Sequence, residues 1–402
     1  MTVSFELSEE QQMMKEEMHT FAKEVVRPQG RHYDETAETP YEIIQEAAKI
    51  GLYSWEGVAG MFGDPTGLMF PVVNEELAWG DAGINLAIFG TTLGLSGITG
   101  RGTPEQIGRW APECFGTPED IHFSAYCVTE AEAGSDLSGM KTTARKDGDD
   151  WVLNGRKYFI TNGGLPKTVH VVVASVEPEL GTRGQASFVV PPGTPGLEMG
   201  HKEVKMGIRA SHTAEVLLDD VRVPSDCLLG GEERLRASLD RARRGESSRS
   251  QAAMGTLEGS RPIVGAQAVG IARAAFEYAL DYAKTRHAFG GPIVEKQAIA
   301  YMLADMRTKI DAARLLVWRA CWMGRAGKTF EAGEGSMAKL MAAEAAVSVT
   351  QQAIQILGGH GYVADHPVEQ WHRDSLVYKL FEGTDQILWL IVASAIANTR
   401  IR

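Results

Sequence analysis

The hydrophobic spacing along this chain changes twice, and these changes limit the possible folds more than any other feature. In the first part, Met14, Met18, Phe21 and Val25 follow one another at spacings of four, three and four residues, which is typical of a helix with one buried face. In the middle part, apolar residues form short β-branched runs separated by Gly and Pro. Helical spacing returns in the last part. The pattern predicts a helical region, then a β region, then a second helical region.

The first region contains further helix signals. Ser8 and Gln11 have the spacing of a capping box, in which two side chains bond the free amides of a helix start. Apolar spacing also predicts helices over 43–50 and 71–78, and a Gly/Thr-rich stretch follows at 90–102.

The middle region is predicted to be a small β-barrel or sandwich. Asn154-Gly155 lies between two apolar triplets, 151–153 and 158–160, which predicts a hairpin with a type I′ turn. Short apolar runs at 169–176, 186–190 and 215–218 predict further strands.

The last region has a seam of apolar residues that alternates spacings of four and three. The members of this seam are Ile299, Leu303, Met306, Ile310, Ala313, Val317 and Ala320. Such spacing indicates a bundle of long antiparallel helices. We therefore predict three domains: residues 1–120 helical, residues 121–231 β, and residues 232–402 a four-helix bundle.

Charge and cysteine content exclude several classes of protein. The chain has 402 residues with 40 Lys and Arg against 52 Asp and Glu, a formal net charge of −12. This acidic balance argues against nucleic acid and anionic membranes as partners. The sequence has no run of about eighteen apolar residues, so we expect no membrane-spanning helix. The four cysteines are far apart, which predicts neither disulfides nor a zinc site, and no targeting segment is evident. We therefore expect a cytoplasmic location.

Four local motifs carry residue types suited to catalysis or cofactor binding. They lie at 126–136, at 286–293 with Gln297 beyond, at 355–362, and at 381–386. Taken singly, each is better explained as a loop, a helix cap or a surface turn than as a functional site. His360 has no second ligand at helical spacing, so no metal site is predicted there.

Taken in order, these motifs and several others resemble the acyl-CoA dehydrogenase family over nearly the entire chain. The matching segments are Leu-Ser-Glu-Glu-Gln at 7–11, Glu-Glu-Leu-Ala at 75–78, Val-Thr-Glu with Gly-Ser-Asp at 128–136, Phe-Ile-Thr-Asn-Gly at 159–163, Lys-Met-Gly-Ile-Arg at 205–209, Arg-His-Ala-Phe-Gly-Gly-Pro-Ile at 286–293, Gly-Gly-His-Gly-Tyr at 358–362 and Glu-Gly-Thr at 382–384. The resemblance implies an α+β fold with an N-terminal helical domain, a middle β-barrel domain and a C-terminal four-helix bundle.

The resemblance also implies a non-covalent FAD cofactor between the β domain and the bundle. The residues that would contact the flavin from the β domain are Tyr126, Val128, Thr129, Gly134, Ser135, Phe159, Ile160 and Thr161. Those that would reach the cofactor of a neighbouring subunit are Arg286, Phe289, Gln297, Gln355, Gly358 and Gly359. Thr384 and Gln386 would touch the cofactor beside the catalytic base. Sharing across subunits implies a homotetramer built as a dimer of dimers.

The activity implied is α,β-dehydrogenation of an acyl-CoA thioester, as in fatty acid metabolism, with electrons passed to an electron-transfer flavoprotein. Glu382 matches the family's base for the α-proton. Ser135, Glu258, Arg261 and Gly383 would lie beside the substrate. Ser260 stands where two branches of the family place their base, so Glu382 has no evident rival. A desolvated Glu also gains a raised pKa suited to this role.

Three questions stay open at this level. A related flavin oxidase or monooxygenase, or a structural subunit of a mixed tetramer, would share most of these motifs. The usual Pro-Glu-Tyr-Gly-Gly of the N-terminal domain is absent around 56–63, which predicts a reshaped acyl pocket. Finally, the stretch 233–251 carries six arginines: Arg234, Arg236, Arg241, Arg243, Arg244 and Arg249. It is either a solvated helical extension or a basic lid over the 3′-phosphate of CoA.

Overall fold

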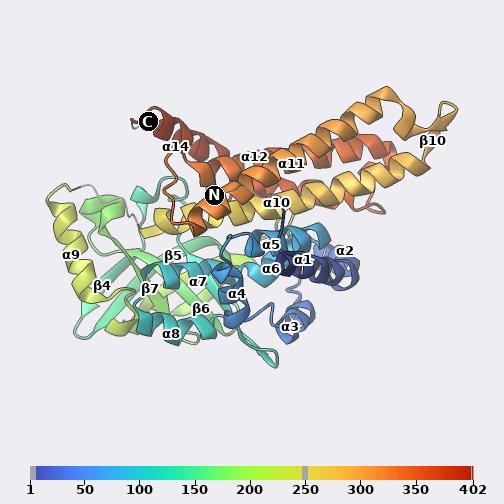
Figure 1. Cartoon of the computed structure of the whole chain (residues 1–402). Coiled ribbons are helices and arrows are strands. Elements are labelled where there is room, and N and C mark those ends of the chain that lie inside the picture. The colour runs from blue at the N-terminus through green and yellow to red at the C-terminus, as the bar shows by residue number, and fades with distance from the viewer. Residues whose placement is uncertain (1–5, 247–251, 400, 402) are drawn as a thin grey trace.

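A computed structural model describes residues 6–246, 252–399 and 401, without the side chains of 252–258. Helices of the first part of the chain lie beside a twisted sheet, and a bundle of long helices lies across both (Figure 1). The α, then β, then α order and the predicted fold class are confirmed.

The first part of the chain is a layer of helices. Their bounds are α1 (Glu9–Phe21), α2 (Gly30–Thr36), α3 (Tyr41–Lys49), α4 (Trp55–Gly63), α5 (Met69–Gly80), α6 (Ala82–Phe89), α7 (Thr91–Arg101) and α8 (Pro104–Glu113). The capping box is present, because Ser8 Oγ accepts from the Gln11 amide at 3.2 Å. Met18 is buried as predicted, and the regular helix gives way to a π turn and a 3-10 turn before Gly30. The Gly/Thr-rich stretch is the helix α7.

The middle part is one seven-stranded sheet with two small ribbons elsewhere in the chain. Its strands are β3 (Phe123–Cys127), β4 (Thr143–Asp147), β5 (Asp150–Thr161), β6 (Thr168–Ser175), β7 (Gln185–Val190), β8 (Leu197–Lys202) and β9 (Thr213–Pro224). They run in the order β3-β6-β4-β5-β9-β8, and β7 pairs with β6. The ribbons are β1 (Gly116–Thr117) with β2 (Asp120–Ile121), and β10 (His287–Ala288) with β11 (Gly291–Pro292).

The hairpin predicted at Asn154-Gly155 is wrong. Both residues lie inside the continuous strand β5, at a register irregularity opposite β9. The Asn154 side chain does not close a turn: its amide donates to Asp220 Oδ1 at 2.9 Å, and its oxygen accepts from the Asp220 amide at 2.9 Å. The hairpin turn is at Gly148, whose φ of 62° joins β4 to β5. A cross-strand partner on β9 therefore overrides the local turn signal.

The last part begins with α9 (Gly231–Arg243), which packs against the 3-10 segments η4 (Pro178–Gly184) and η5 (Ser225–Cys227) beside the sheet. The bundle follows, with α10 (Ala252–Thr285), α11 (Gln297–Arg325), α12 (Glu334–Leu357), α13 (Val368–Ser375) and α14 (Asp385–Ile396). The predicted seam on α11 is confirmed, because Leu303, Met306, Ile310, Ala313, Val317 and Ala320 are all buried.

The N-terminal layer is joined to the bundle where α5 meets α10. An added Cβ at Gly270 would lie 2.3 Å from the Glu75 carbonyl oxygen, so only glycine allows the two backbones to approach this closely. Beside this contact, Arg273 and Arg314 both bond the Glu75 carboxylate at 2.9 Å. Burial acts to raise the pKa of Glu75, but the two guanidinium groups outweigh it and hold the pKa below its usual value.

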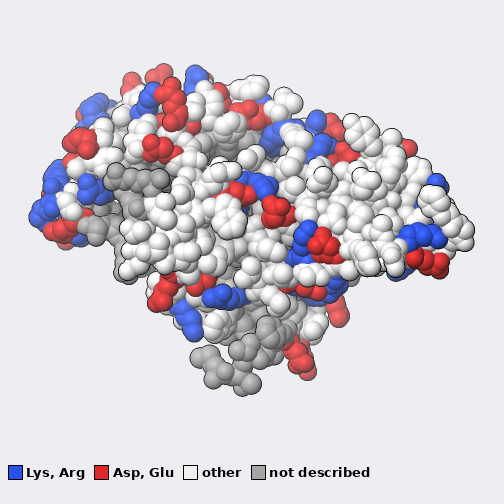
Figure 2. Space-filling model, turned by 90° about the horizontal axis from the view of Figure 1, so that it is seen from above, with Lys and Arg blue, Asp and Glu red and all other residues white. Residues whose placement is uncertain are grey.

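The stretch Ala82–Arg101, which comprises α6 and α7, meets the length and apolar composition of a membrane-spanning helix, and 78% of that window is buried inside this fold. Seen from above, charged side chains form scattered clusters with broad uncharged areas between them (Figure 2).

We expect Gly270→Ala to lower the free energy of unfolding by about 1–3 kcal/mol, because the added methyl overpacks the contact between α5 and α10. Gly108→Ala is the matched control, since Gly108 lies on the exposed side of α8 with open space around it. This control should gain about 0.5–1 kcal/mol from helix propensity. Urea unfolding followed by far-UV circular dichroism measures both, and equal effects of the two variants would contradict the packing argument.

Candidate active site

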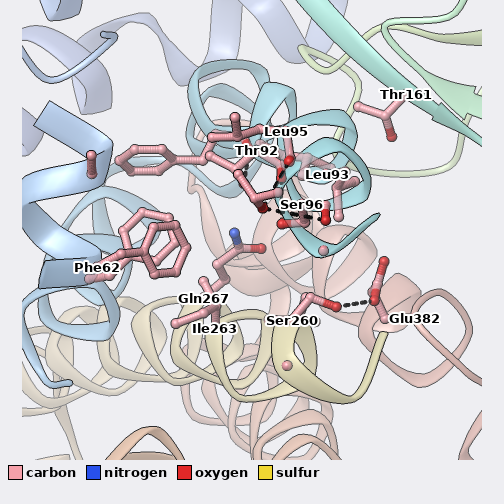
Figure 3. Close-up of a pocket in the computed structure, with 18 of the residues that line it drawn as sticks. Phe62, Thr92, Leu93, Leu95, Ser96, Thr161, Ser260, Ile263, Gln267 and Glu382 are labelled. Atoms are coloured by element: carbon pink, nitrogen blue, oxygen red, sulfur yellow. Dashed lines mark hydrogen bonds between the residues drawn. The ribbon is translucent and has the colours of Figure 1, made fainter. Parts of the chain in front are cut away.

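A cavity of about 750 Å³ lies where the N-terminal helices, the sheet and the bundle meet. Its walls come from α4 to α7, from Thr161 at the end of β5, from α9 and α10, and from the turn before α14. Phe62 lies at one side and Glu382 at the other, with Gln267 and Ile263 between them (Figure 3). The cavity thus has a titratable end and an apolar end.

The apolar end is mainly aromatic. Trp55 and Phe62 come from α4, Phe70 from α5 and Phe89 from α6. The rings of Phe62 and Phe70 are 4.6 Å apart, and those of Phe70 and Phe89 are 5.1 Å apart. Because α4 contains most of the 56–63 segment, that segment forms part of the aromatic end of the cavity.

Glu382 lies in a strained turn directly before α14. Its φ is 54°, in the left-handed region that non-glycine residues rarely adopt, and Gly383 follows with a φ of 102°. Two buried cations hold the turn by its carbonyl oxygens: Arg261 Nε donates to the Glu382 oxygen at 3.1 Å, and Lys339 Nζ donates to the Gly383 oxygen at 2.8 Å. The position of the carboxylate therefore depends on α10 and α12.

The Glu382 carboxylate accepts a hydrogen bond from Ser260 Oγ at 2.6 Å (Figure 3). Desolvation raises the pKa of Glu382 above its ordinary value, although Ser260, Arg261 and Lys339 each act to lower it. Burial also lowers the pKa of Lys339 to about 8. A carboxylate with a raised pKa, facing an apolar cavity, is suited to accept a proton from carbon.

The predicted cofactor residues of the sheet form one group along its edge. Tyr126 is the last residue but one of β3, and Val128, Thr129, Gly134 and Ser135 follow the strand. The amide of Tyr158 donates to the Thr129 oxygen at 2.9 Å, which joins this segment to β5. On β5, Phe159 is 63% exposed with a φ of 59°, Ile160 is buried, and Thr161 faces the cavity.

A second group of predicted cofactor residues lies at the far end of the bundle. Arg286 follows α10, Phe289 is at the tip of the β10–β11 ribbon, and Gln297 begins α11. Gln355 lies in the last turn of α12, with Gly358 and Gly359 after it. All six are exposed, and Phe289 is 94% exposed. Within the described residues, the side chains of Arg286, Gln297 and Gln355 have no hydrogen-bond or ion-pair partner.

The two groups cannot meet within one chain. Ser260, beside Glu382, lies near the start of α10, and Arg286 follows its last residue. The helix between Ser260 and Thr285 is about 37 Å long at about 1.5 Å per residue. A site that uses both groups therefore needs two copies of the chain.

The remaining predicted residues lie around the Glu382 turn. Thr384 caps α14, accepting from the Ile387 amide at 3.5 Å, and Gln386 is exposed on its first turn. Arg261 is 1% exposed and lies behind Glu382. Ser135 is exposed at the sheet edge. The side chain of Glu258 lies outside the described residues.

Sequence reasoning missed most of the cavity lining. The aromatic residues and Gln267 carry no motif of their own, and only the unusual 56–63 segment predicts a changed pocket. Lys339, which holds the Glu382 turn without lining the cavity, carries no motif either. Arg101 and Arg234 also line the cavity. In the sequence, Arg234 is one of six arginines in the stretch 233–251, and Arg101 is a single cation in a Gly/Thr-rich segment. Neither position by itself predicts a place in the cavity wall.

The described residues offer no group of three His, Cys, Asp or Glu side chains that could hold a metal ion. His360 instead bonds the Tyr282 hydroxyl at 2.8 Å through Nδ1. For a flavin the edge of the sheet is suitable, because the hydroxyls of Thr129, Ser135 and Thr161 make no hydrogen bond to another described residue. They are available to a polar ring placed beside the cavity.

Family models match the chain in three consecutive parts. Acyl-CoA dehydrogenase, N-terminal domain, matches residues 8–116; the middle domain matches residues 125–221; and the C-terminal domain matches residues 250–397.

Individual relatives agree with these matches over nearly the full chain. The chain is 38% identical over 395 residues to the mitochondrial short-chain specific acyl-CoA dehydrogenase of Bos taurus, covering 97% of this chain and 90% of that protein. It is 34% identical to butyryl-CoA dehydrogenase from Megasphaera elsdenii, with a TM-score of 0.87 over 98% and 100% of the two chains. A chain of the structure described as electron transferring flavoprotein of Acidaminococcus fermentans is 34% identical, with a TM-score of 0.86 over 98% and 99%.

The raised pKa of Glu382 makes stability depend on pH. Below the pKa of an unfolded Glu, the carboxyl is protonated in both states and the site carries no penalty. As pH rises through the folded pKa, ionisation costs more in the folded protein, and stability falls. The side chain of Glu382→Gln stays neutral at every pH. The urea midpoint of this variant minus that of the wild type should therefore increase as the pH is raised from 5 to 8.

Ser260→Ala is the comparison variant for this measurement. It removes a hydrogen bond that lowers the pKa of Glu382, so its stability should fall more than that of the wild type over the same pH range. A pH-independent difference between the wild type and Glu382→Gln would show that desolvation does not govern this carboxylate.

Proposed function

The chain belongs to the acyl-CoA dehydrogenase family of oxidoreductases, and from this premise we propose that it catalyses FAD-dependent α,β-dehydrogenation of an acyl-CoA thioester, giving the trans-2-enoyl-CoA. The observation that carries the proposal is Glu382, a carboxylate of raised pKa held at the wall of a large, mainly apolar cavity. The aromatic end of the cavity suits an apolar acyl group, because burying its methylenes is favourable.

Glu382 accepts the α-proton of the substrate. Before the reaction, Ser260 holds the carboxylate in one orientation, while Arg261 and Lys339 fix the turn by its carbonyl oxygens. The amide of Glu382 is the donor this chain offers to the thioester oxygen, on which negative charge develops. The apolar walls exclude water from the acidified carbon.

FAD fits between the sheet edge and the cavity, where Tyr126, Val128, Thr129, Gly134 and Ser135 would face one side of it and Phe159, Ile160 and Thr161 the other. When bound, the flavin supplies the hydride acceptor for the β-hydrogen. The free hydroxyls of Thr129, Ser135 and Thr161 support this assignment, since a polar ring edge needs donors and acceptors of this kind.

The functional unit is a homotetramer, built as a dimer of dimers. Arg286, Phe289, Gln297 and Gln355 are exposed, and within the described residues their side chains have no hydrogen-bond or ion-pair partner. They lie too far from Glu382 to serve the site of their own chain. In a second copy they would bind the pyrophosphate and adenine end of the cofactor, with Gly358 and Gly359 allowing its close approach. Exposed Tyr301, Tyr362 and Trp389 on the bundle elements also favour burial against another subunit.

The electron acceptor proposed is an electron-transfer flavoprotein, and the proposed location is the cytoplasm. The match to a chain in the Acidaminococcus fermentans structure supports the first of these. A flavin oxidase is the rival function, and the two differ in one measurement. With a dehydrogenase, a suitable acyl-CoA bleaches the flavin in the absence of oxygen, and little hydrogen peroxide forms in air. With an oxidase, hydrogen peroxide forms in air at the rate at which substrate is lost.

Glu382→Gln should slow flavin reduction by at least about a hundredfold, because it removes the general base while keeping the size of the side chain. Acyl-CoA binding should survive and still perturb the flavin spectrum. Anaerobic stopped-flow absorbance measures both. Glu258→Gln is the control, expected to reduce at a rate near that of the wild type. If Glu258→Gln were inactive and Glu382→Gln reduced its flavin normally, the catalytic base would be Glu258 on α10 and not Glu382.

Arg286→Ala should weaken FAD binding about ten- to a hundredfold, since a charge-assisted hydrogen bond contributes about 1.5–3 kcal/mol. Lys284→Ala is the control, because Lys284 pairs with Asp281 at 3.4 Å on the same helix. FAD occupancy after dilution and gel filtration is the measurement. A wild-type monomer that keeps all of its FAD would contradict the shared site.

A further inference from the structure

Two cations line the cavity without a carboxylate partner among the described residues. Arg101, the last residue of α7, and Arg234, on the first turn of α9, are both part of the cavity wall. Arg234 Nη1 donates to the Arg101 carbonyl oxygen at 3.0 Å, so the two residues lie side by side. Neither guanidinium has an ion-pair partner within the described chain.

Most of the other arginines described in the stretch 233–251 pair with carboxylates. Arg241 makes no ion pair within the described residues, but it is not part of the cavity wall. Arg236 bonds Glu232 at 2.8 Å, Arg243 bonds Glu177 and Asp240, and Arg244 bonds Glu246 at 2.6 Å. A solvated helical extension explains these pairs, but it does not explain Arg234. Arg249 lies outside the described residues.

The two cations also disfavour each other. Burial lowers the pKa of Arg101 below its ordinary value, the Tyr126 hydroxyl acts to raise it, and the charge of Arg234 acts to lower it further. The dipole at the end of α7 favours one cation there, but it gives no reason for a second one beside the first. An anion between the two guanidinium groups would relieve both the burial and the repulsion.

The position of the pair selects the kind of anion. Phe89 ends α6 at the aromatic end of the cavity, just before α7 begins at Thr91. Arg101 is the last residue of α7, a helix about 16 Å long. A substrate whose acyl group fills the aromatic end has its thioester at Glu382, and its carrier leaves the cavity past the opposite end. Arg234 is exposed there, so the pair faces the outgoing carrier.

The helix α9 is held in place to present Arg234. Its first turn is joined to the sheet by Glu232, which pairs with Lys146, and to α8 by Gly230, whose amide donates to Gln106 at 2.9 Å. Its last turn is joined to the sheet region by Arg243, through the bond to Glu177 at 3.1 Å. The segment is thus a fixed wall of the cavity.

From these contacts we infer that Arg101 and Arg234 form a phosphate-binding site for the carrier arm of the thioester, which makes the protein selective for CoA esters over thioesters without phosphate. This inference rests on the proposed function for the identity of the ester. The binding itself is independent of catalysis, because free CoA carries the same phosphates.

Isothermal titration of the FAD-loaded protein with free CoA, 3′-dephospho-CoA and pantetheine tests the site. CoA should bind more tightly than pantetheine, and less tightly as salt increases. Arg234→Ala should weaken CoA binding about tenfold or more and leave pantetheine unchanged. Arg236→Ala, two residues further along the same helix, is the control with no expected effect. Arg101→Lys keeps the charge of the half-buried residue and should retain much of the affinity, whereas Arg101→Met should lose it.

Three results would overturn the inference. Arg234→Ala and Arg236→Ala could bind CoA alike, or Arg234→Ala could weaken pantetheine as much as CoA. The arginine variants could instead lose only a preference for glutaryl-CoA over butyryl-CoA, which would assign the pair to a carboxylate on the acyl group. If no acyl-CoA bleaches the flavin but CoA binding depends on Arg234, the proposed dehydrogenation fails and the phosphate site stands.

Discussion

The close contact between α5 and α10 is the constraint on which the rest of this structure depends. Gly270 allows the backbone of α10 to reach the Glu75 carbonyl, and two arginines neutralise the buried Glu75 carboxylate beside it. Removing one partner from such a cluster would leave a buried charge uncompensated. Because α10 also carries Ser260 and Arg261, the same contact sets where the N-terminal cavity walls face the Glu382 turn.

The site combines strain with desolvation. Glu382 adopts a left-handed conformation that costs on the order of 1 kcal/mol or more, and it persists because Arg261 and Lys339 hold the adjoining carbonyl groups. The same cations lower the pKa of the carboxylate, but desolvation prevails and keeps it raised. Strain and desolvation at Glu382 therefore lower the stability of the fold, and they keep one basic group oriented toward the cavity.

The polar groups of interest lie at separate places along the bundle and around the cavity. Arg286 and its exposed neighbours lie at one end of α10, and Glu382 lies near the other, so the long helix separates these two groups of residues. Around the cavity, Phe62 and Glu382 lie on opposite sides, and Arg101 ends α7, away from Phe89 at the end of α6. A thioester with an apolar acyl group and a phosphorylated carrier matches this order of environments.

Hydrophobic periodicity by itself determined the α, β, α order and the buried seam of α11, and the spacing of Ser8 and Gln11 determined the capping box. Helix spacing and capping are local properties, so the sequence alone determines them. Ordered motifs also predicted Glu382 as the base and two sets of residues for a cofactor. Tertiary structure decided the rest. Asn154-Gly155 is part of a continuous strand because the side chain of Asn154 bonds Asp220 on β9. The local sequence pattern that predicts a turn contains no information about this distant partner. The aromatic end of the cavity and the pair Arg101 and Arg234 join residues distant in sequence, and only folding brings them to one wall.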